Sequence, residues 1–223
     1  MKAITVYFER NKKYRTLHKV FRQSAYDNGL DLDTLCIDIP DHDKKIKKSD
    51  HYYDCSYAHL IACDYLLNNP GDVAVCDSDL MIRRPLDDVL KYDFDIAVTV
   101  RAGIPYNTGI WFVKDTALAA DFIELWAKNT RMLFEKIETY EDYIHSHGGI
   151  DQAALDYTIQ MGLSTKILEL PCTIWNACQG EWESVTDDTR VIHIKSKLRQ
   201  ACFGARAPED YMIPLIEEWR KYL

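Results

Sequence analysis

The sequence predicts an α/β protein with a mainly parallel central sheet flanked by helices. Short apolar segments rich in β-branched residues alternate with segments of helical periodicity through the first half of the chain, and this alternation is typical of parallel sheets covered by helices. Two expected strands, at residues 95–100 and 109–113, follow one another without a helix between them, so we expect the sheet to be mixed there. The apolar run at residues 73–76 ends in two carboxylates, and ligands bind at such carboxyl ends of strands.

The other elements follow from periodicity and turn signals. Before the acidic strand we expect a strand at 3–8, a helix ending near Gly29, a strand at 34–39, a polar exposed loop at 41–54 and a helix at 57–67. After it we expect a helical turn at 85–90, a helix at 116–134, an irregular segment at 135–149, a helix at 150–161 and a strand at 165–170. A strand at 191–194 and an amphipathic helix at 208–222 complete the chain.

Composition limits the class of protein. The chain has 223 residues with 27 Lys or Arg against 35 Asp or Glu, a net charge of −8. An acidic chain is a poor general binder of nucleic acid, because phosphate binding depends on clustered positive charge. No segment approaches the roughly 20 apolar residues that span a bilayer. The N-terminus enters a strand pattern at once without a signal peptide, and the seven cysteines lack Cys-x-x-Cys spacing. We therefore expect a reduced, cytoplasmic protein without a zinc site.

Asp77 and Asp79 are the most informative residues of the chain. Burying a carboxylate without a partner costs roughly several kcal/mol, so two of them at the end of a buried strand require a counter-charge. Oxygen ligands on a short loop suit Mg²⁺ or Mn²⁺. An isolated Asp-x-Asp is also common in surface turns, so the metal interpretation depends on three later segments.

Two of these segments are polar and contain glycine. Asn107 and Gly109 precede an apolar strand, where Gly109 would let a ligand approach the backbone and Asn107 can donate and accept hydrogen bonds. A plain turn explains them equally well. Asp151 and Gln152 open a helix after two glycines and could bind sugar hydroxyls. Asp151 alone would also suit a helix N-terminus, because of the helix dipole.

The third segment begins at His193, which ends an apolar strand. Lys195, Lys197 and Arg199 follow at every second position. If the extended conformation continues, these side chains point to the same side as His193. A neutral imidazole beside three cations suits a metal ligand next to a phosphate-binding surface. A buried core histidine followed by a solvated basic strand edge is the alternative.

In this order, the four segments resemble those of the GT-A glycosyltransferases, most closely the retaining family that includes glycogenin and bacterial lipopolysaccharide galactosyltransferases. The resemblance covers roughly residues 1–200. It implies a single domain over residues 1–223 with the Rossmann-like GT-A fold, in which 1–100 form the nucleotide-binding half and 101–223 the acceptor-side half and C-terminal helix. The implied reaction moves a hexose from a nucleotide diphosphate sugar, a UDP-sugar by analogy, to an acceptor hydroxyl with retention of configuration.

The resemblance implies the following roles. Asp77, Asp79 and His193 would hold Mn²⁺ or Mg²⁺, and Asp77 would also touch the ribose. The donor sugar and nucleotide would be held by residues from four segments: Asn107 and Asp151 on the sugar, Gln152 at the β-face of the anomeric carbon, Arg199 on the phosphate, and Tyr7 stacked near the base.

The chain departs from the family pattern at two places. His59 stands where the family usually has an arginine in the helix before the Asp-x-Asp strand, so its donor contact is in question. After His193, Ser196 replaces a glycine, Arg199 replaces a lysine and a Pro-Trp pair is missing. Lys195 and Lys197 would then share the binding of phosphate.

Two other functions remain open at this point. A degenerate, non-catalytic sugar-nucleotide binder is favoured slightly by these departures. A nucleotidyltransferase is disfavoured, because residues 9–13 after the first strand contain no glycine. The acceptor would contact the segments 41–54 and 135–149, and a glycan, a lipid-linked sugar, a protein hydroxyl or a modified nucleic-acid base all remain possible.

Overall fold

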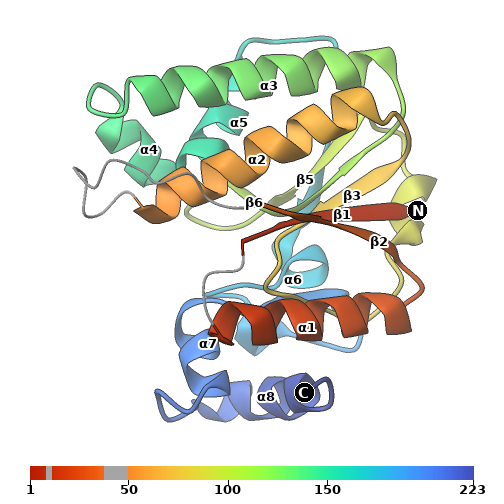
Figure 1. The fold of residues 1–223 in the computed structure, drawn as a ribbon, viewed down its shortest axis with the longest axis vertical. Helices are drawn as coiled ribbons and strands as arrows, with labels where there is room; N and C mark the ends of the chain where they lie inside the picture. The colour runs from red at the N-terminus through yellow and green to blue at the C-terminus, as the bar shows by residue number, and fades with distance from the viewer. Residues whose placement is uncertain (9–11, 38–49) are drawn as a thin grey trace.

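The computed structural model describes residues 1–8, 12–37 and 50–223, without the side chains of 50–53. A six-stranded sheet in the order β2-β1-β3-β6-β5-β7 lies between two layers of helices (Figure 1). Only β6 among these strands runs antiparallel to its neighbours, β3 and β5, in this described part of the chain. The predicted α/β class and the mixed, mainly parallel sheet are confirmed.

The strands of this sheet are short. Their bounds are β1 Lys2–Tyr7, β2 Asp31–Cys36, β3 Val73–Cys76, β5 Ile96–Val100, β6 Tyr106–Val113 and β7 Ile167–Pro171. A separate two-stranded antiparallel sheet joins β4 Leu80–Ile82 to β8 Val191–His193. We did not expect β4 from the sequence, because its three residues continue the apolar run after the two aspartates.

Helices cover both faces of the central sheet (Figure 1). One face carries α2 Asp50–Asn68, α3 Ala117–Glu135, α4 Glu141–His147 and α5 Ile150–Gln160. The opposite side holds α1 Lys12–Asp27, α6 Cys172–Trp175, α7 Ser196–Cys202 and α8 Ile213–Arg220. Short 3₁₀ turns occur at Asp87–Lys91, Trp182–Ser184 and Asp210–Met212. None of the helices described is long and apolar enough to cross a bilayer.

Alternation along β6 divides the core between the two faces of the sheet. Trp111 packs on Trp126 of α3 with ring centroids 4.8 Å apart, whereas Phe112 meets the edge of Trp175 at 5.6 Å. Successive side chains of a strand point to opposite faces, so the apolar second half of β6, residues 110–113, packs against helices on both sides. This burial fixes the central strands whose ends carry the polar residues.

Several predicted boundaries are wrong. β2 begins at Asp31 rather than at 34 and ends before 37. α2 begins at Asp50, so the predicted loop at 41–54 overlaps this helix, and the rest of that segment lies outside the described residues. The segment at 135–149, predicted to be irregular, contains α4, because Tyr143 and Ile144 pack toward the core below it. Element boundaries are set by such tertiary contacts as well as by local pattern.

The carboxyl edge of the parallel strands gathers the polar segments. Because β6 is antiparallel, its first residues lie at the same edge as the ends of β3 and β5. The pairing of β5 with β6 shifts between Val98 and Thr99, which pair with Trp111 and Asn107. Thr108 and Gly109 therefore lie in an irregularity of the ladder, a feature that often occurs beside functional sites.

Candidate active site

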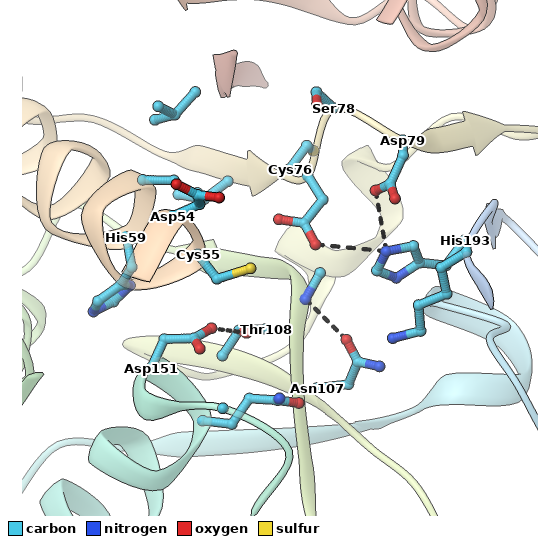
Figure 2. Close-up of a pocket in the computed structure, with 18 of the residues that line it drawn as sticks. Asp54, Cys55, His59, Cys76, Ser78, Asp79, Asn107, Thr108, Asp151 and His193 are labelled. Carbon is cyan, nitrogen blue, oxygen red and sulfur yellow. Dashed lines mark hydrogen bonds and ion pairs between the residues drawn. The ribbon is translucent and has the colours of Figure 1, made fainter. Parts of the chain in front are cut away.

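A cavity of about 670 Å³ opens at this edge of the sheet (Figure 2), a volume within the usual range for small-molecule sites. Most of the residues predicted from the sequence line it. These are His59, Asp77, Asp79, Asn107, Gly109, Asp151, Gln152, His193, Lys195 and Arg199. Tyr7 and Lys197 are not among the residues that line it.

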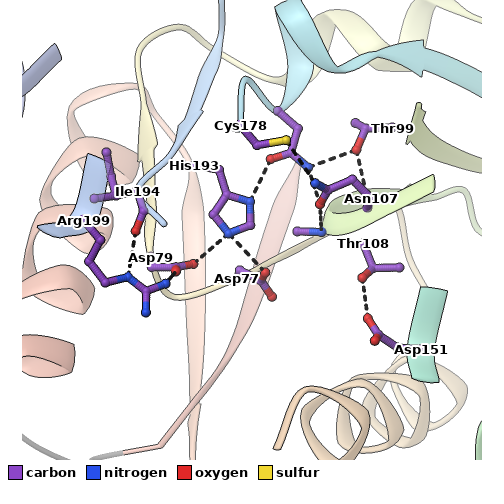
Figure 3. Close-up of polar contacts among 12 residues, drawn as sticks. Asp77, Asp79, Thr99, Asn107, Thr108, Asp151, Cys178, His193, Ile194 and Arg199 are labelled. Carbon is purple, nitrogen blue, oxygen red and sulfur yellow. Dashed lines mark hydrogen bonds and ion pairs between the residues drawn. The ribbon is translucent and has the colours of Figure 1, made fainter. Parts of the chain in front are cut away.

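Asp77, Asp79 and His193 form a cluster at one end of the cavity (Figures 2 and 3). Nε2 of His193 lies 3.1 Å from Oδ1 of Asp79 and 3.5 Å from Oδ2 of Asp77. One ligand atom from each residue can be chosen so that all three lie within 4.8 Å of one another. The aspartates follow β3, while His193 ends β8, and the pairing of Leu80 with His193 brings the two segments together.

The orientation of His193 leaves Nε2 as the ligand atom. Nδ1 lies 3.2 Å from Oδ1 of Asn176 (Figure 3). The amide nitrogen of Asn176 donates to Thr99 and to Asn107, both at 3.0 Å. Its oxygen therefore accepts from Nδ1–H of the imidazole, and a neutral ring then has its Nε2 lone pair facing the two carboxylates.

The pKa values of Asp77, Asp79 and His193 are all shifted from their ordinary values. Burial and the charges of Asp79 and Asp151 raise the pKa of Asp77 well above its ordinary value, although its side chain is half-exposed. Burial also disfavours ionised Asp79, but His193 and Arg199 hold its pKa well below the ordinary range. Burial and Lys195 lower the pKa of His193 and outweigh Asp79, which raises it. Two carboxylates and a lone pair converging on one point fit a divalent cation.

Gly109 makes room for the histidine. A Cβ at this position would lie 2.5 Å from Cε1 and 2.6 Å from Nδ1 of His193, closer than real contacts allow. The amide of Gly109 also donates to Oδ1 of Asn107 at 2.9 Å, and its carbonyl accepts from the amide of Asp77 at 2.8 Å. The glycine predicted to let a ligand approach is therefore required by the candidate metal ligand itself.

The extended conformation does not continue along the segment after His193, so the condition for Lys195, Lys197 and Arg199 to point to one side is not met. Lys195 is still extended, but Ser196 has φ 45° and begins helix α7. Lys197 consequently points to Glu209, with Nζ 3.5 Å from Oε1, and does not line the cavity. Lys195 and Arg199 do line it.

Arg199 contacts Asp79, one of the three candidate metal ligands. Its guanidinium donates to Oδ2 of Asp79, and Nε donates to the carbonyl of Ile194 at 3.1 Å (Figure 3). Nη1 lies 3.2 Å from the hydroxyl of Tyr14. These bonds hold Asp79 in place from the side opposite His193, so Arg199 orients a candidate metal ligand as well as adding positive charge to the cavity.

The predicted sugar-binding residues lie together at the start of α5 and of β6. Asp151 is buried and accepts a hydrogen bond from the hydroxyl of Thr108 (Figure 2). Its carbonyl accepts from Nε1 of Trp126 at 3.0 Å, which fixes the first turn of α5. Asn107 is buried, and its Nδ2 lies 3.3 Å from Sγ of Cys178. Asn107 thus belongs to the network that orients His193.

Tyr7 does not line the cavity, whereas His59 does. Tyr7 stacks on His18 of α1, with ring centroids 4.2 Å apart, because its side chain points to the α1 face of the sheet. The adjacent Phe8 lines the cavity instead. His59 is packed against Trp126, with ring centroids 4.1 Å apart, and burial lowers its pKa to about 3. A neutral imidazole there cannot replace the positive charge of an arginine.

Sequence reasoning missed several residues of the cavity. Asp54 and Cys55, one helical turn before His59, line it, as do Tyr14 of α1 and Arg101. Arg101 could have been found, because it directly follows the strand predicted at 95–100 and so lies at the same edge. Asp54 and Cys55 carried no such signal, because the helix was predicted to begin at residue 57. Tyr14 carried none either, because the sequence does not show where α1 lies relative to the cavity.

Comparison with known proteins supports the fold. No protein-family model and no curated protein sequence matches the chain. A glycosyltransferase involved in the glycosylation of the major capsid of PBCV-1 has a similar structure, with a TM-score of 0.60, 12% identity and 98% of each chain covered. The galactosyltransferase LgtC, in complex with donor and acceptor sugar analogues, gives a TM-score of 0.56 at 12% identity, covering 100% of this chain and 95% of that one.

A longer protein is also similar. The glycosyltransferase GlyE of Streptococcus pneumoniae TIGR4 matches with a TM-score of 0.63 and 14% identity, and the match covers 99% of this chain and 60% of GlyE. The chain therefore has the fold of these glycosyltransferases, the GT-A fold expected from the sequence. At these identities the likeness extends to the fold and not to a particular reaction.

Substitution of Gly109 by Ala should weaken metal binding. The added Cβ displaces His193, and we expect the affinity for Mn²⁺ to fall at least about tenfold, as for changes that misorient a metal ligand. Titration calorimetry with Mn²⁺ measures this. In a His193→Ala background the same substitution should have no further effect, because the clash is gone. An equal loss in both backgrounds would contradict the assignment.

Metal binding should also release a proton from Asp77. Because its pKa is raised, this carboxyl holds a proton at mildly acidic pH more than an ordinary aspartate does, and a bound cation must expel it. The affinity for Mn²⁺ is therefore expected to decrease as the pH falls toward that raised pKa. Calorimetry in buffers of different ionisation enthalpy counts the protons released. Asp77→Asn should abolish the release, and a release that persists in this variant would refute the assignment to Asp77.

Proposed function

We propose that the protein is a metal-dependent glycosyltransferase that moves a hexose from a nucleotide diphosphate sugar, with UDP-sugars as first candidates, to an acceptor hydroxyl. The observation that carries this proposal is the convergence of Asp77, Asp79 and His193 in a cavity at the carboxyl edge of a GT-A sheet. The fold alone hosts several functions, whereas this ligand set is suited to a cation that binds a diphosphate. LgtC, described as a galactosyltransferase, supports a hexose as the transferred group.

The leaving group in this reaction is a nucleoside diphosphate, on which negative charge increases as the glycosidic bond breaks. Mn²⁺ or Mg²⁺, held by Asp77, Asp79 and His193, would supply Lewis-acid stabilisation of that charge. Lys195 lines the cavity and makes no ion pair with any carboxylate of the described residues. Its ammonium group is therefore available to the diphosphate, and Arg199 adds a second fixed positive charge.

The sugar would lie on the other side of the cavity. We place Asp151 as the acceptor of a sugar hydroxyl hydrogen bond, with Gln152 next to the anomeric carbon, where its amide would stabilise an oxocarbenium-like transition state. Asn107 would contribute mainly by positioning its neighbours. Residues 1–100 would bind the nucleotide, and residues 101–223 would form the acceptor side. The acceptor itself is one of the hydroxyl-bearing classes named above.

A non-catalytic sugar-nucleotide binder is the second candidate. Its support is His59, whose buried neutral ring cannot supply the cation that the family has at this position. The argument against a nucleotidyltransferase is that residues 9–13 contain no glycine, and residues 9–11 lie outside the described part of the chain. The cluster of metal ligands and the neighbouring Asp151 and Gln152 favour the transferase over both.

Donor hydrolysis tests the proposal directly. A screen of UDP- and GDP-sugars with Mn²⁺ should find slow release of nucleoside diphosphate from one donor. We expect Asp79→Ala to reduce this release at least about 100-fold, because one of the three protein ligands of the metal is lost. Asp93→Ala is the matched control, since Asp93 is an exposed carboxylate that pairs with Lys166. Nucleotide binding without release from any donor or transfer to any acceptor would favour the binder instead.

Product stereochemistry tests the predicted retention. Attack on the face from which the diphosphate departs leaves the anomeric configuration unchanged, and so would a double displacement with Asp151 as the nucleophile. NMR of the product formed from an α-linked donor should therefore show an α-linkage. A β-linked product would refute same-face attack and would require a base positioned for inversion.

A further inference from the structure

We propose that Thr108 is a positioning residue of the active site, whose hydroxyl holds the carboxylate of Asp151 in the orientation that binds the donor sugar. This inference rests on the proposed function and deepens it, because it names the residue that controls the contact between Asp151 and the sugar. Thr108 lies between Asn107 and Gly109, and the sequence alone assigned it no role.

A hydrogen bond joins β6 to the first turn of α5 inside the cavity. The hydroxyl of Thr108 donates to Oδ2 of Asp151 (Figures 2 and 3), and both residues line the cavity. Asp151 is 7% exposed, and no other side chain or backbone amide among the described residues donates to its carboxylate. Thr108 is therefore the donor that sets how this carboxylate is turned.

The backbone on both sides of this bond is fixed independently of it. Nε1 of Trp126 donates to the carbonyl of Asp151 at 3.0 Å. Ile150 and Leu155 of α5 are fully buried in the same core cluster as Trp111 of β6. Backbone pairing with β3 and β5 holds β6 itself. Loss of the Thr108 hydroxyl should therefore free the carboxylate without moving α5 or β6.

The irregular pairing of β5 with β6 gives Thr108 this position. Trp111 points to the face of the sheet that carries α3 and α5, and regular alternation from Trp111 would turn Thr108 to the opposite face. The irregularity lies between Asn107 and Trp111 and changes this alternation, so Thr108 faces α5. Asn107 faces the other way and bonds to Asn176. Irregularities of this kind re-aim side chains beside functional sites, and here one serves both the metal network and Asp151.

The hydrogen bond leaves one oxygen of Asp151 for the substrate. Oδ2 is occupied by Thr108, whereas Oδ1 has no hydrogen-bond partner among the described residues and keeps accessible surface. A carboxylate accepts hydrogen bonds and does not donate them, so the free oxygen suits a hydroxyl of the sugar. The bond from Thr108 holds this oxygen in place before the donor arrives, and such support of a contacting residue by a second one is what precise binding requires.

Donor binding compared with UDP binding tests the proposal. In calorimetry with Mn²⁺, UDP-galactose and UDP-glucose are the donors, and UDP is the reference that lacks a sugar. Thr108→Val removes the hydroxyl and nearly keeps the shape of the side chain. We expect it to weaken the binding of at least one donor about tenfold, while the affinity for UDP stays within about twofold of wild type. Thr108→Ser keeps a hydroxyl and should restore most of the donor affinity, whereas a general structural lesion would weaken UDP binding as well.

A double-mutant cycle assigns the effect to Asp151. Once Asp151→Ala has removed the carboxylate, Thr108→Val should change donor affinity no further, because the group that it positions is absent. Thr165→Val is the matched control, since the hydroxyl of Thr165 donates to the carbonyl of Leu118 at 3.2 Å and does not line the cavity. Unchanged donor affinity in Thr108→Val, an equal loss on top of Asp151→Ala, or binding of UDP but of neither donor overturns this inference alone. Absence of binding of UDP and of both donors overturns the proposed function and this inference with it.

Discussion

The site depends on the repulsion between two carboxylates and on the imidazole that faces them. Backbone hydrogen bonds impose this arrangement, because β4 pairs with β8 in a register that sets Leu80 opposite His193. The amide of Ile194 also donates to the carbonyl of Asp79 at 2.9 Å. This pairing holds the backbone of Asp79 beside that of His193. A divalent cation bound between the two carboxylates would remove their mutual repulsion, which favours its binding.

A second network keeps the imidazole in its productive orientation. Asn176 bonds to His193, Thr99 and Asn107, and thereby ties the end of β8 to β5 and β6. Gly109 leaves the space into which the ring fits. Since each of these groups has its partners within the protein, the ligand atoms are held before any cation arrives, which is the arrangement that metal sites generally require. The irregular pairing of β5 with β6 is what brings this network together.

The sequence was sufficient for the fold and for most of the cluster, because both depend on local patterns. Alternating apolar segments predict the α/β sheet, and acidic residues at a strand end predict a cation. The errors arise where tertiary contacts decide the conformation. Ser196 turns the chain into α7, which separates Lys197 from Lys195. Tyr7 was assigned to the nucleotide although strand alternation sets it on the face opposite Val6, a lining residue of the cavity.

His59 and Arg101 both line the cavity, but only Arg101 carries a positive charge. His59 lies between Trp111 and Trp126, with ring centroids 5.9 and 4.1 Å away, and such apolar surroundings disfavour a positive charge. A positively charged side chain in the cavity must therefore come from a residue other than His59. Arg101 also lines the cavity, and its Nη1 lies 3.3 Å from Sγ of Cys178. A positive charge thus reaches this cavity from the residue that follows β5 rather than from α2.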